Sequence, residues 1–234
     1  MVDVVLVGTV HRDPEGQDKL LSILHEEDPV YITLEMSPYA VRFRRRKRLV
    51  LRNRVCCILG DLVREGLALT SRDPLSHPAV RNVLSAVDFP YEYMAVSLFS
   101  RSNHVPFRCI DRSDFSKKKI SRLERELISR ENLQTLIGLN PHEIYRQIKQ
   151  QYTLAFMALG RGQNAVYRPQ NGRTMSKRDR FMAWKIREVL DSTPCHKLVH
   201  VGGWEHLIDY GSQETLFTLL SDLHPQRRLL DCRH

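Results

Sequence analysis

The sequence predicts an α/β protein with a predominantly parallel central sheet flanked by helices. Short runs rich in Val, Leu and Ile alternate with longer segments of helical spacing, and strands separated by helices pair in parallel through right-handed crossovers. Two runs near opposite ends of the chain break into the same pattern, a glycine followed three residues later by a histidine: Gly8 to His11, and Gly203 to His206. With 234 residues, 42% of them hydrophobic, the chain is long enough to bury a full core.

Five strands are expected because each of these runs is short, apolar and bounded by polar or turn-forming residues. Their parallel pairing would bring all of their carboxyl ends to one edge of the sheet. They cover residues 4–7, 30–34, 107–110, 198–201 and 228–230.

The expected helices fill the segments between the strands. The best-marked start is Ser37-Pro38, with serine as N-cap and proline at the first helical position, and apolar spacing extends this helix to about Gly66. Residues 160–172 are predicted to form a loop because Gly, Asn, Gln and Pro are frequent there. The other helices are expected at 14–27, 74–87, 91–102, 117–137, 141–159, 174–190 and 214–223.

The chain is expected to form one domain, residues 1–234. No repeat, low-complexity segment or long linker divides it. The mainly helical stretch from about 115 to 190 is interpreted as an insertion or cap on the sheet.

Composition favours a reduced, cytoplasmic protein without a membrane span. No window approaches 18 apolar residues, and the first residues are expected to form a strand of the fold instead of a signal peptide. The cysteine count of five is odd and no CxxC spacing occurs, which argues against a disulfide framework. The oligomeric state stays open.

The net charge of +9 favours an acidic partner. The densest basic cluster is RFRRRKR, Arg42–Arg48. We interpret it mainly as a solvated helix face, with weak, non-specific contact to nucleic acid or an anionic surface as the alternative. No RNP aromatics, C2H2 spacing or KH-type loop is present.

Four side chains of the metal-ligand type follow predicted strands: His11, Glu35, Asp111 and His206. In an open parallel sheet, ligands bind beyond the carboxyl ends of the strands, so we expect these four to meet at one edge. We expect Gly8 and Gly203 to let the backbone turn sharply there. A lone histidine at such a place is more often a hydrogen-bonded structural residue, but the repeated pattern favours a site.

Six short motifs carry a resemblance to a known family, in this order: GTVH at 8–11, TLEMSP at 33–38, PYEYMAVSLF at 90–99, CIDR at 109–112, KRDRFMAWKI at 177–186 and VHVGGWEH at 199–206. This order resembles the TraB/PrgY family, whose relatives include the TIKI metalloproteases and, more distantly, erythromycin-esterase and ChaN-like proteins. The resemblance covers residues 4 to about 210.

The resemblance implies a divalent-metal site in which His11, His206 and Glu35 are ligands. It also implies roles for Glu92, for the strand-end pair Asp111 and Arg112, and for Arg178 and Asp179. The chain departs from the family pattern at three positions: Lys177 stands in place of a glutamate, and Trp204 and Glu205 stand in place of small residues. Glu205 is either an added carboxylate of the site or a solvated side chain.

The donor types indicate hydrolysis. Imidazole and carboxylate ligands suit Mn, Fe, Co or Zn and can leave a position for water. Glu35 or Glu92 is a candidate proton acceptor, and Arg112 or Arg178 would stabilise an oxyanion. We therefore expect a metal-dependent, peptidase-like hydrolase acting on a peptide or small molecule. The alternatives are a non-catalytic ligand-binding or regulatory protein and, less favoured, a nucleic-acid-associated protein.

Overall fold

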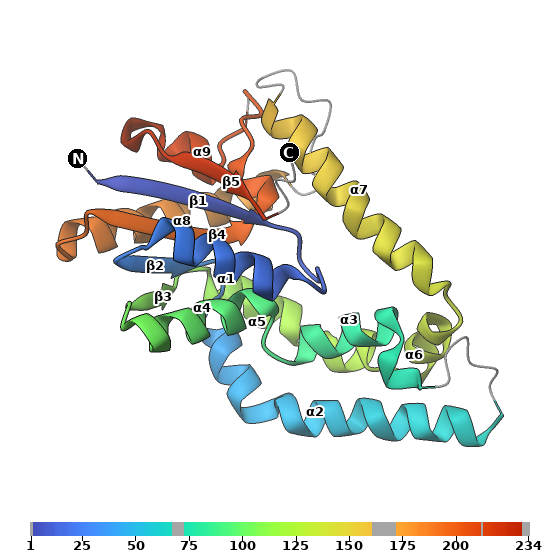
Figure 1. The fold of residues 1–234 in the computed structure, drawn as a ribbon. Coiled ribbons are helices and arrows are strands. Elements are labelled where there is room, and N and C mark those ends of the chain that lie inside the picture. The colour runs from blue at the N-terminus through green and yellow to red at the C-terminus, as the bar shows by residue number, and fades with distance from the viewer. Residues whose placement is uncertain (1, 67–72, 161–171, 212, 231–234) are drawn as a thin grey trace. The chain divides into compact units, whose positions relative to one another are not determined.

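The computed structural model describes residues 2–66, 73–160, 172–211 and 213–230 (Figure 1). The chain divides into two compact units. The sheet unit comprises Met1–Pro38, Tyr91–Arg112 and Gln150–His234, and the helical unit comprises Tyr39–Pro90 and Ser113–Lys149.

All five strands of the sheet unit pair in parallel, in the order β3-β2-β4-β1-β5. The predicted α/β class, with a parallel sheet flanked by helices, is confirmed (Figure 1). Leu34 of β2 lies beside both Val201 of β4 and Cys109 of β3, so the strands end together at one edge. The strands are β1 (Asp3–Thr9), β2 (Tyr31–Leu34), β3 (Phe107–Cys109), β4 (Lys197–Gly203) and β5 (Gln226–Leu229).

Helices cover both faces of this sheet, and its three central strands, β1, β2 and β4, are accordingly buried on both sides. On one face, Val4 and Leu6 of β1 share a core with Met182 and Ile186 of α8 (Gly172–Ser192) and with Leu216 of α9 (Leu216–Leu219). Side chains alternate along a strand, so the neighbouring residues of β1 point to the opposite face. There α1 (Gly16–Glu27) packs beside α4 (Tyr91–Asn103). Two short 3-10 helices follow β4 and α9: η4 (Trp204–Leu207) and η5 (Ser221–Leu223).

The helical unit has a hydrophobic core of its own. Leu51 and Val55 of α2 (Pro38–Arg64) pack with Val80 of α3 (Pro78–Val87) and with Ile128 and Leu133. This shared core explains why the unit unites 39–90 with 113–149, whereas the sequence suggested a helical insertion at about 115–190. Its other elements are η1 (Pro74–Ser76), α5 (Ser113–Ile120), the π-helical η2 (Leu123–Leu127), α6 (Arg130–Ile137) and the first half of α7 (Pro141–Gly160).

The single helix expected at 117–137 is broken in the structure. Helix α5 ends at Ile120, and α6 begins at Arg130 after η2. Ser129 caps α6, because its hydroxyl accepts a 3.1 Å hydrogen bond from the Asn132 N–H. Charge alternation and apolar spacing persist across this break, so periodicity alone could not reveal it.

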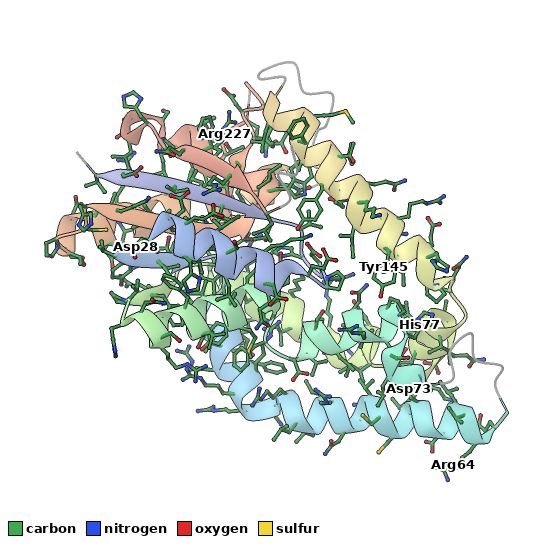
Figure 2. The ribbon with its side chains drawn as sticks, in the orientation of Figure 1. Asp28, Arg64, Asp73, His77, Tyr145 and Arg227 are labelled. Atoms are coloured by element: carbon green, nitrogen blue, oxygen red, sulfur yellow. The ribbon has the colours of Figure 1, made fainter. Side chains whose placement is uncertain are left out.

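Polar side chains of the helical unit serve as helix caps. Figure 2 labels Asp73 and His77, which cap η1 and α3. His77 is buried, its Nδ1 accepts from the Ala79 N–H at 3.2 Å, and its Nε2 lies 3.0 Å from the Leu139 carbonyl oxygen. These two bonds require the proton on Nε2.

Within the described part of the chain, no helix combines the length and the apolar character needed to cross a bilayer. The loop predicted at 160–172 falls almost wholly outside the described residues.

The carboxylate of Glu27 ties helix α1 to two strands. Glu27 forms an ion pair with Lys197 of β4 at 2.8 Å and another with Arg228 of β5, and its side chain is only 10% exposed. Burial by itself raises the pKa of Glu27, but its hydrogen bonds to the two cations outweigh this effect and lower that pKa below its ordinary value.

We expect Glu27→Gln to lower the free energy of unfolding at pH 7 by about 2 kcal/mol, the range for hydrogen bonds to charged groups. Because the folded pKa is depressed, this stability is present above pH 4.5 and is lost as the pH falls through the folded value. Urea titrations at several pH values measure the difference. Glu26 pairs with the same Arg228 but is more than half exposed, so Glu26→Gln should cost less than about 1 kcal/mol. Equal losses for the two variants at pH 7 would contradict the prediction.

Candidate active site at the carboxyl edge of the sheet

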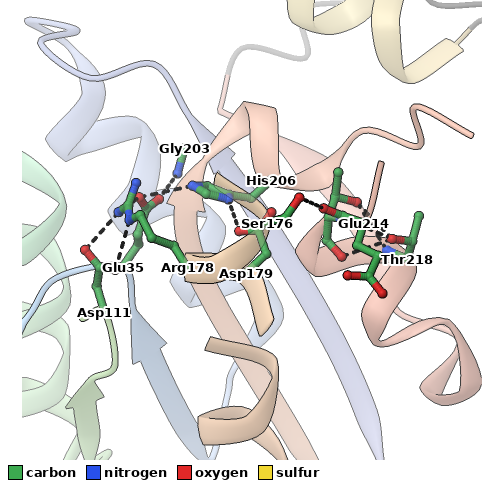
Figure 3. Close-up of polar contacts among 10 residues, drawn as sticks. Glu35, Asp111, Ser176, Arg178, Asp179, Gly203, His206, Glu214 and Thr218 are labelled. Carbon is green, nitrogen blue, oxygen red and sulfur yellow. Dashed lines mark hydrogen bonds and ion pairs between the residues drawn. The ribbon is translucent and has the colours of Figure 1, made fainter. Parts of the chain in front are cut away.

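The structure gathers most of the predicted site residues at the carboxyl edge of the sheet (Figure 3). Glu35 directly follows β2, Asp111 follows β3, and His206 lies in η4 just after β4. Helix α8 supplies Arg178 and Asp179 to the same place. All of these residues belong to the sheet unit.

Glu35 is the centre of the cluster. Its Oε1 accepts from Nη2 of Arg178 at 2.5 Å and lies 3.1 Å from Nε2 of His206, and its Oε2 accepts from the Gly203 N–H at 2.6 Å. The side chain is 5% exposed. Burial by itself raises the pKa of Glu35, but the charges of His206 and Arg178 hold it well below its usual value. Glu35 is therefore an ionised carboxylate surrounded by donors.

Arg178 joins two carboxylates from different strand ends. Besides Glu35, it contacts Asp111 with both Nε, at 3.1 Å from Oδ1, and Nη2, at 2.8 Å from Oδ2. Burial by itself lowers the pKa of Arg178, but the two carboxylates raise it above its ordinary value. The planar guanidinium matches such a bidentate contact, so Arg178 fixes α8 against the ends of β2 and β3.

His206 is held between two carboxylates. Its Nδ1 bonds to Oδ1 of Asp179, while its Nε2 faces Glu35. Burial by itself lowers the pKa of His206, but Glu35 and Asp179 raise it to about 10. The other oxygen of Asp179, Oδ2, is buried and has no hydrogen-bond partner among the described residues.

His11, like His206, has its Nδ1 against a buried carboxylate. Its Nδ1 lies 2.7 Å from Oε1 of Glu92, a buried carboxylate that also accepts from the Thr9 hydroxyl at 3.1 Å. The hydroxyl of Tyr91 donates to the Val10 carbonyl at 3.1 Å and supports the loop that carries His11. His11 itself has 63% of its side chain exposed. It therefore forms the solvent side of the cluster.

The glycines of the two motifs provide space, which corrects the expectation that they provide sharp turns. Gly203 has φ −61°, which other residues adopt readily. A Cβ built on Gly203 would lie 3.4 Å from Nε2 of His11, 3.5 Å from Oε2 of Glu35 and 3.8 Å from Cδ2 of His206. A Cβ on Gly8 would lie 3.0 Å from two leucine side chains. The left-handed turn after β1 is at Arg12, with φ 73°.

One buried residue of the cluster was not predicted. His200 points from β4 to the same face as its register partner Thr33, whose hydroxyl lies 3.0 Å from its Nδ1. Burial lowers the pKa of His200 to about 3, so the imidazole is neutral. Its Nε2 has no hydrogen-bond partner among the described residues. The signal in the sequence is a polar residue in the middle of an apolar strand.

The remaining predicted site residues are less central. Arg112 and Glu205 are half-buried and Lys177 is exposed, and the guanidinium that reaches Glu35 is that of Arg178. Trp204 is buried, and its indole N–H donates to Oε1 of Gln151 at 3.2 Å.

The basic segment Arg42–Arg48 lies on α2, in the helical unit. Arg44 is structural, since its guanidinium donates to the Asp88 and Ala86 carbonyls, at 2.8 and 3.0 Å, at the end of α3. Arg48 lies over the Phe89 ring, 5.5 Å from its centroid. Lys47 is exposed. Contact of this segment with nucleic acid or an anionic surface stays a prediction.

Comparison with protein families, curated proteins and solved structures finds no match to this chain. Among the described residues, no group of three or more His, Cys, Asp or Glu side chains is arranged to hold a metal ion. The function is therefore argued from the chemistry of the cluster.

Proposed function

We propose that this protein is a metal-dependent hydrolase, peptidase-like in its chemistry, with its site at the Glu35 cluster. One observation carries the proposal: two histidines from the ends of two strands each place Nδ1 on a buried carboxylate and turn the ring toward the space over Gly203 beside Glu35. Metal-binding histidines almost always have their second nitrogen on a carboxylate, carbonyl or water. The resemblance to the TraB/PrgY family supports the same proposal.

The residues present fit a divalent cation in donor type. Two imidazole nitrogens and a carboxylate suit Mn, Co or Zn, and the missing side chain of Gly203 leaves a space bordered by Nε2 of His11, Oε2 of Glu35 and the Cδ2 edge of the His206 ring. At neutral pH His206 carries a proton that bonds to Glu35. A cation would have to displace that proton, so its affinity should increase with pH.

A bound cation would supply a water of lowered pKa. The protein's own groups would position the reaction around it. Glu35, ionised and buried, would be the carboxylate ligand of the cation. Arg178 holds the Glu35 carboxylate in place and brings positive charge for a developing oxyanion. Glu92 and Asp179 orient the two imidazoles.

The test replaces each proposed histidine ligand with glutamine. We expect His11→Gln and His206→Gln to weaken metal binding by more than about 100-fold, the upper range for outer-shell partners of metal ligands, and to abolish peptide cleavage. His11 is largely exposed, so its variant should keep its fold. Elemental analysis of protein purified without chelator measures the metal, and cleavage of a peptide library with Mn²⁺, Co²⁺ or Zn²⁺ added back measures turnover.

The exposed His196 is the matched control, and His196→Gln should change neither quantity. A wild-type protein that binds no divalent metal under these conditions would overturn the proposal. Metal binding without turnover on any substrate would instead favour a non-catalytic, ligand-binding protein.

A further inference from the structure

Three imidazoles around Glu35 share one arrangement. Each has Nδ1 anchored by an oxygen of a neighbouring element: Glu92 anchors His11, Asp179 anchors His206, and the Thr33 hydroxyl anchors His200. In each ring, Nε2 is the nitrogen away from this anchor; that of His206 faces Glu35, and that of His200 has no hydrogen-bond partner among the described residues. The proposed function uses only the first two rings, so His200 has no assigned role.

The third imidazole lies next to Glu35 because Gly202 has no side chain. Glu35 directly follows Leu34, the register partner of Val201, so Glu35 lies beside Gly202 on the face of the sheet that carries His200 and Thr33. A Cβ on Gly202 would lie 2.9 Å from Nε2 of His200 and 3.0 Å from Oε2 of Glu35. The two atoms are therefore separated by at most about 6 Å, and both are turned toward the glycine.

The Nε2 of His200 is a buried polar atom without a described partner. Such groups are uncommon, because an unpaired buried polar atom costs about 1–3 kcal/mol. Metal-binding imidazoles typically have one nitrogen fixed by a hydrogen bond and the other turned toward the metal, and the His200 ring is held in this way, with Nδ1 on Thr33 and Nε2 turned toward the Glu35 carboxylate.

We infer that His200 supplies a third imidazole donor, through Nε2, to the divalent cation proposed above. The inference rests on the proposed function and extends its ligand set to His11, His200, His206 and Glu35. Three imidazoles and one carboxylate favour a transition metal such as Zn²⁺ or Co²⁺ over Mg²⁺ or Ca²⁺, which prefer oxygen ligands. Thr33 would then be an outer-shell residue that fixes the His200 tautomer.

The test compares two substitutions at position 200 by Zn²⁺ and Co²⁺ titration. In His200→Asn, the amide can reproduce the bond of Nδ1 to Thr33 but offers no atom at the position of Nε2. In His200→Gln, the amide reaches the position of Nε2 but leaves Thr33 without its partner. We expect the asparagine variant to bind each metal at least about tenfold more weakly than wild type, and Thr33→Val to lose about ten- to hundredfold, as outer-shell substitutions do. His196→Asn, at an exposed position, is the control.

A second measurement needs no variant. Nitrogen-15 NMR of the wild-type histidine side chains should show His200 in the tautomer with its proton on Nδ1 and its Nε2 coordinated when Zn²⁺ is added. This keeps the inference testable if position 200 tolerates no substitution.

The outcomes separate the two proposals. Wild-type protein that binds metal while His200→Asn binds it equally well, or while Nε2 of His200 shows no coordination shift, would overturn the inference and leave the proposed function intact. Wild-type protein that binds no Zn²⁺ or Co²⁺ would overturn both. Weaker binding in the asparagine variant together with a coordinated Nε2 supports the inference.

Discussion

Arg178→Met is expected to lower the free energy of unfolding of the sheet unit by about 3–5 kcal/mol, because removing one partner of a buried ion pair leaves uncompensated buried charge. Both carboxylates that Arg178 contacts are nearly buried, Asp111 at 6% and Glu35 at 5% exposed. Methionine fills similar space without charge. Both tryptophans, Trp184 and Trp204, belong to the sheet unit, so a urea titration followed by tryptophan fluorescence reports its unfolding.

Arg180 provides the matched control on the same helix. It pairs with Glu214, and both side chains are substantially exposed, at 65% and 47%. Arg180→Met should therefore cost less than about 1 kcal/mol. Arg178→Lys keeps one charge but loses the bidentate fork, and its cost should fall between the two. A loss at Arg178 no greater than that at Arg180 would show that the ion cluster does not stabilise the fold.

Gly203→Ala should block the proposed site while sparing the fold. Its Cβ would enter the space between His11, Glu35 and His206 at 3.4–3.8 Å, which are ordinary contacts with the protein, and φ −61° suits alanine. Overpacking costs about 1–3 kcal/mol, roughly ten- to hundredfold in affinity. We expect a loss of this size in Co²⁺ affinity, and unfolding free energy within about 1 kcal/mol of wild type. Isothermal titration and urea unfolding measure the two quantities.

The neighbouring glycine should behave in the opposite way. A Cβ on Gly202 would lie 2.9 Å from His200 and 3.0 Å from Glu35, so Gly202→Ala must displace buried side chains and should destabilise the sheet unit by about 1–3 kcal/mol. Gly60 on α2 has no atom within 4 Å of a built Cβ, so Gly60→Ala controls for general effects of alanine. Unchanged metal affinity in Gly203→Ala would exclude the space over Gly203 as the ligand position.

The local sequence pattern was sufficient to predict the strands and the edge of the sheet at which the polar side chains gather. Each strand is an apolar run between helical segments, and parallel strands necessarily bring their carboxyl ends to one edge. Glu35, Asp111 and His206 could therefore be placed near one another before any coordinates. Arg178 was suggested by family resemblance alone, because it lies inside helix α8 and not at the end of a predicted strand.

The tertiary structure decided which side chains contact one another at that edge. Whether Asp179 contacts its neighbour on α8 or His206 depends on how the helix is rotated against the sheet, and it contacts His206. The orientation of His200 toward Glu35 depends on the register of β2 against β4, since a shift of one residue would turn it to the other face.

The sequence by itself thus determined the fold class and the residues at the sheet edge, because hydrophobic periodicity and strand ends are local properties of the chain. Only the tertiary structure decided that Gly203 leaves space between His11, Glu35 and His206, that His200 lies beside Glu35, and that residues 39–90 share a core with 113–149. Those features arise from close packing between segments distant in sequence, where register and helix rotation select which atoms meet.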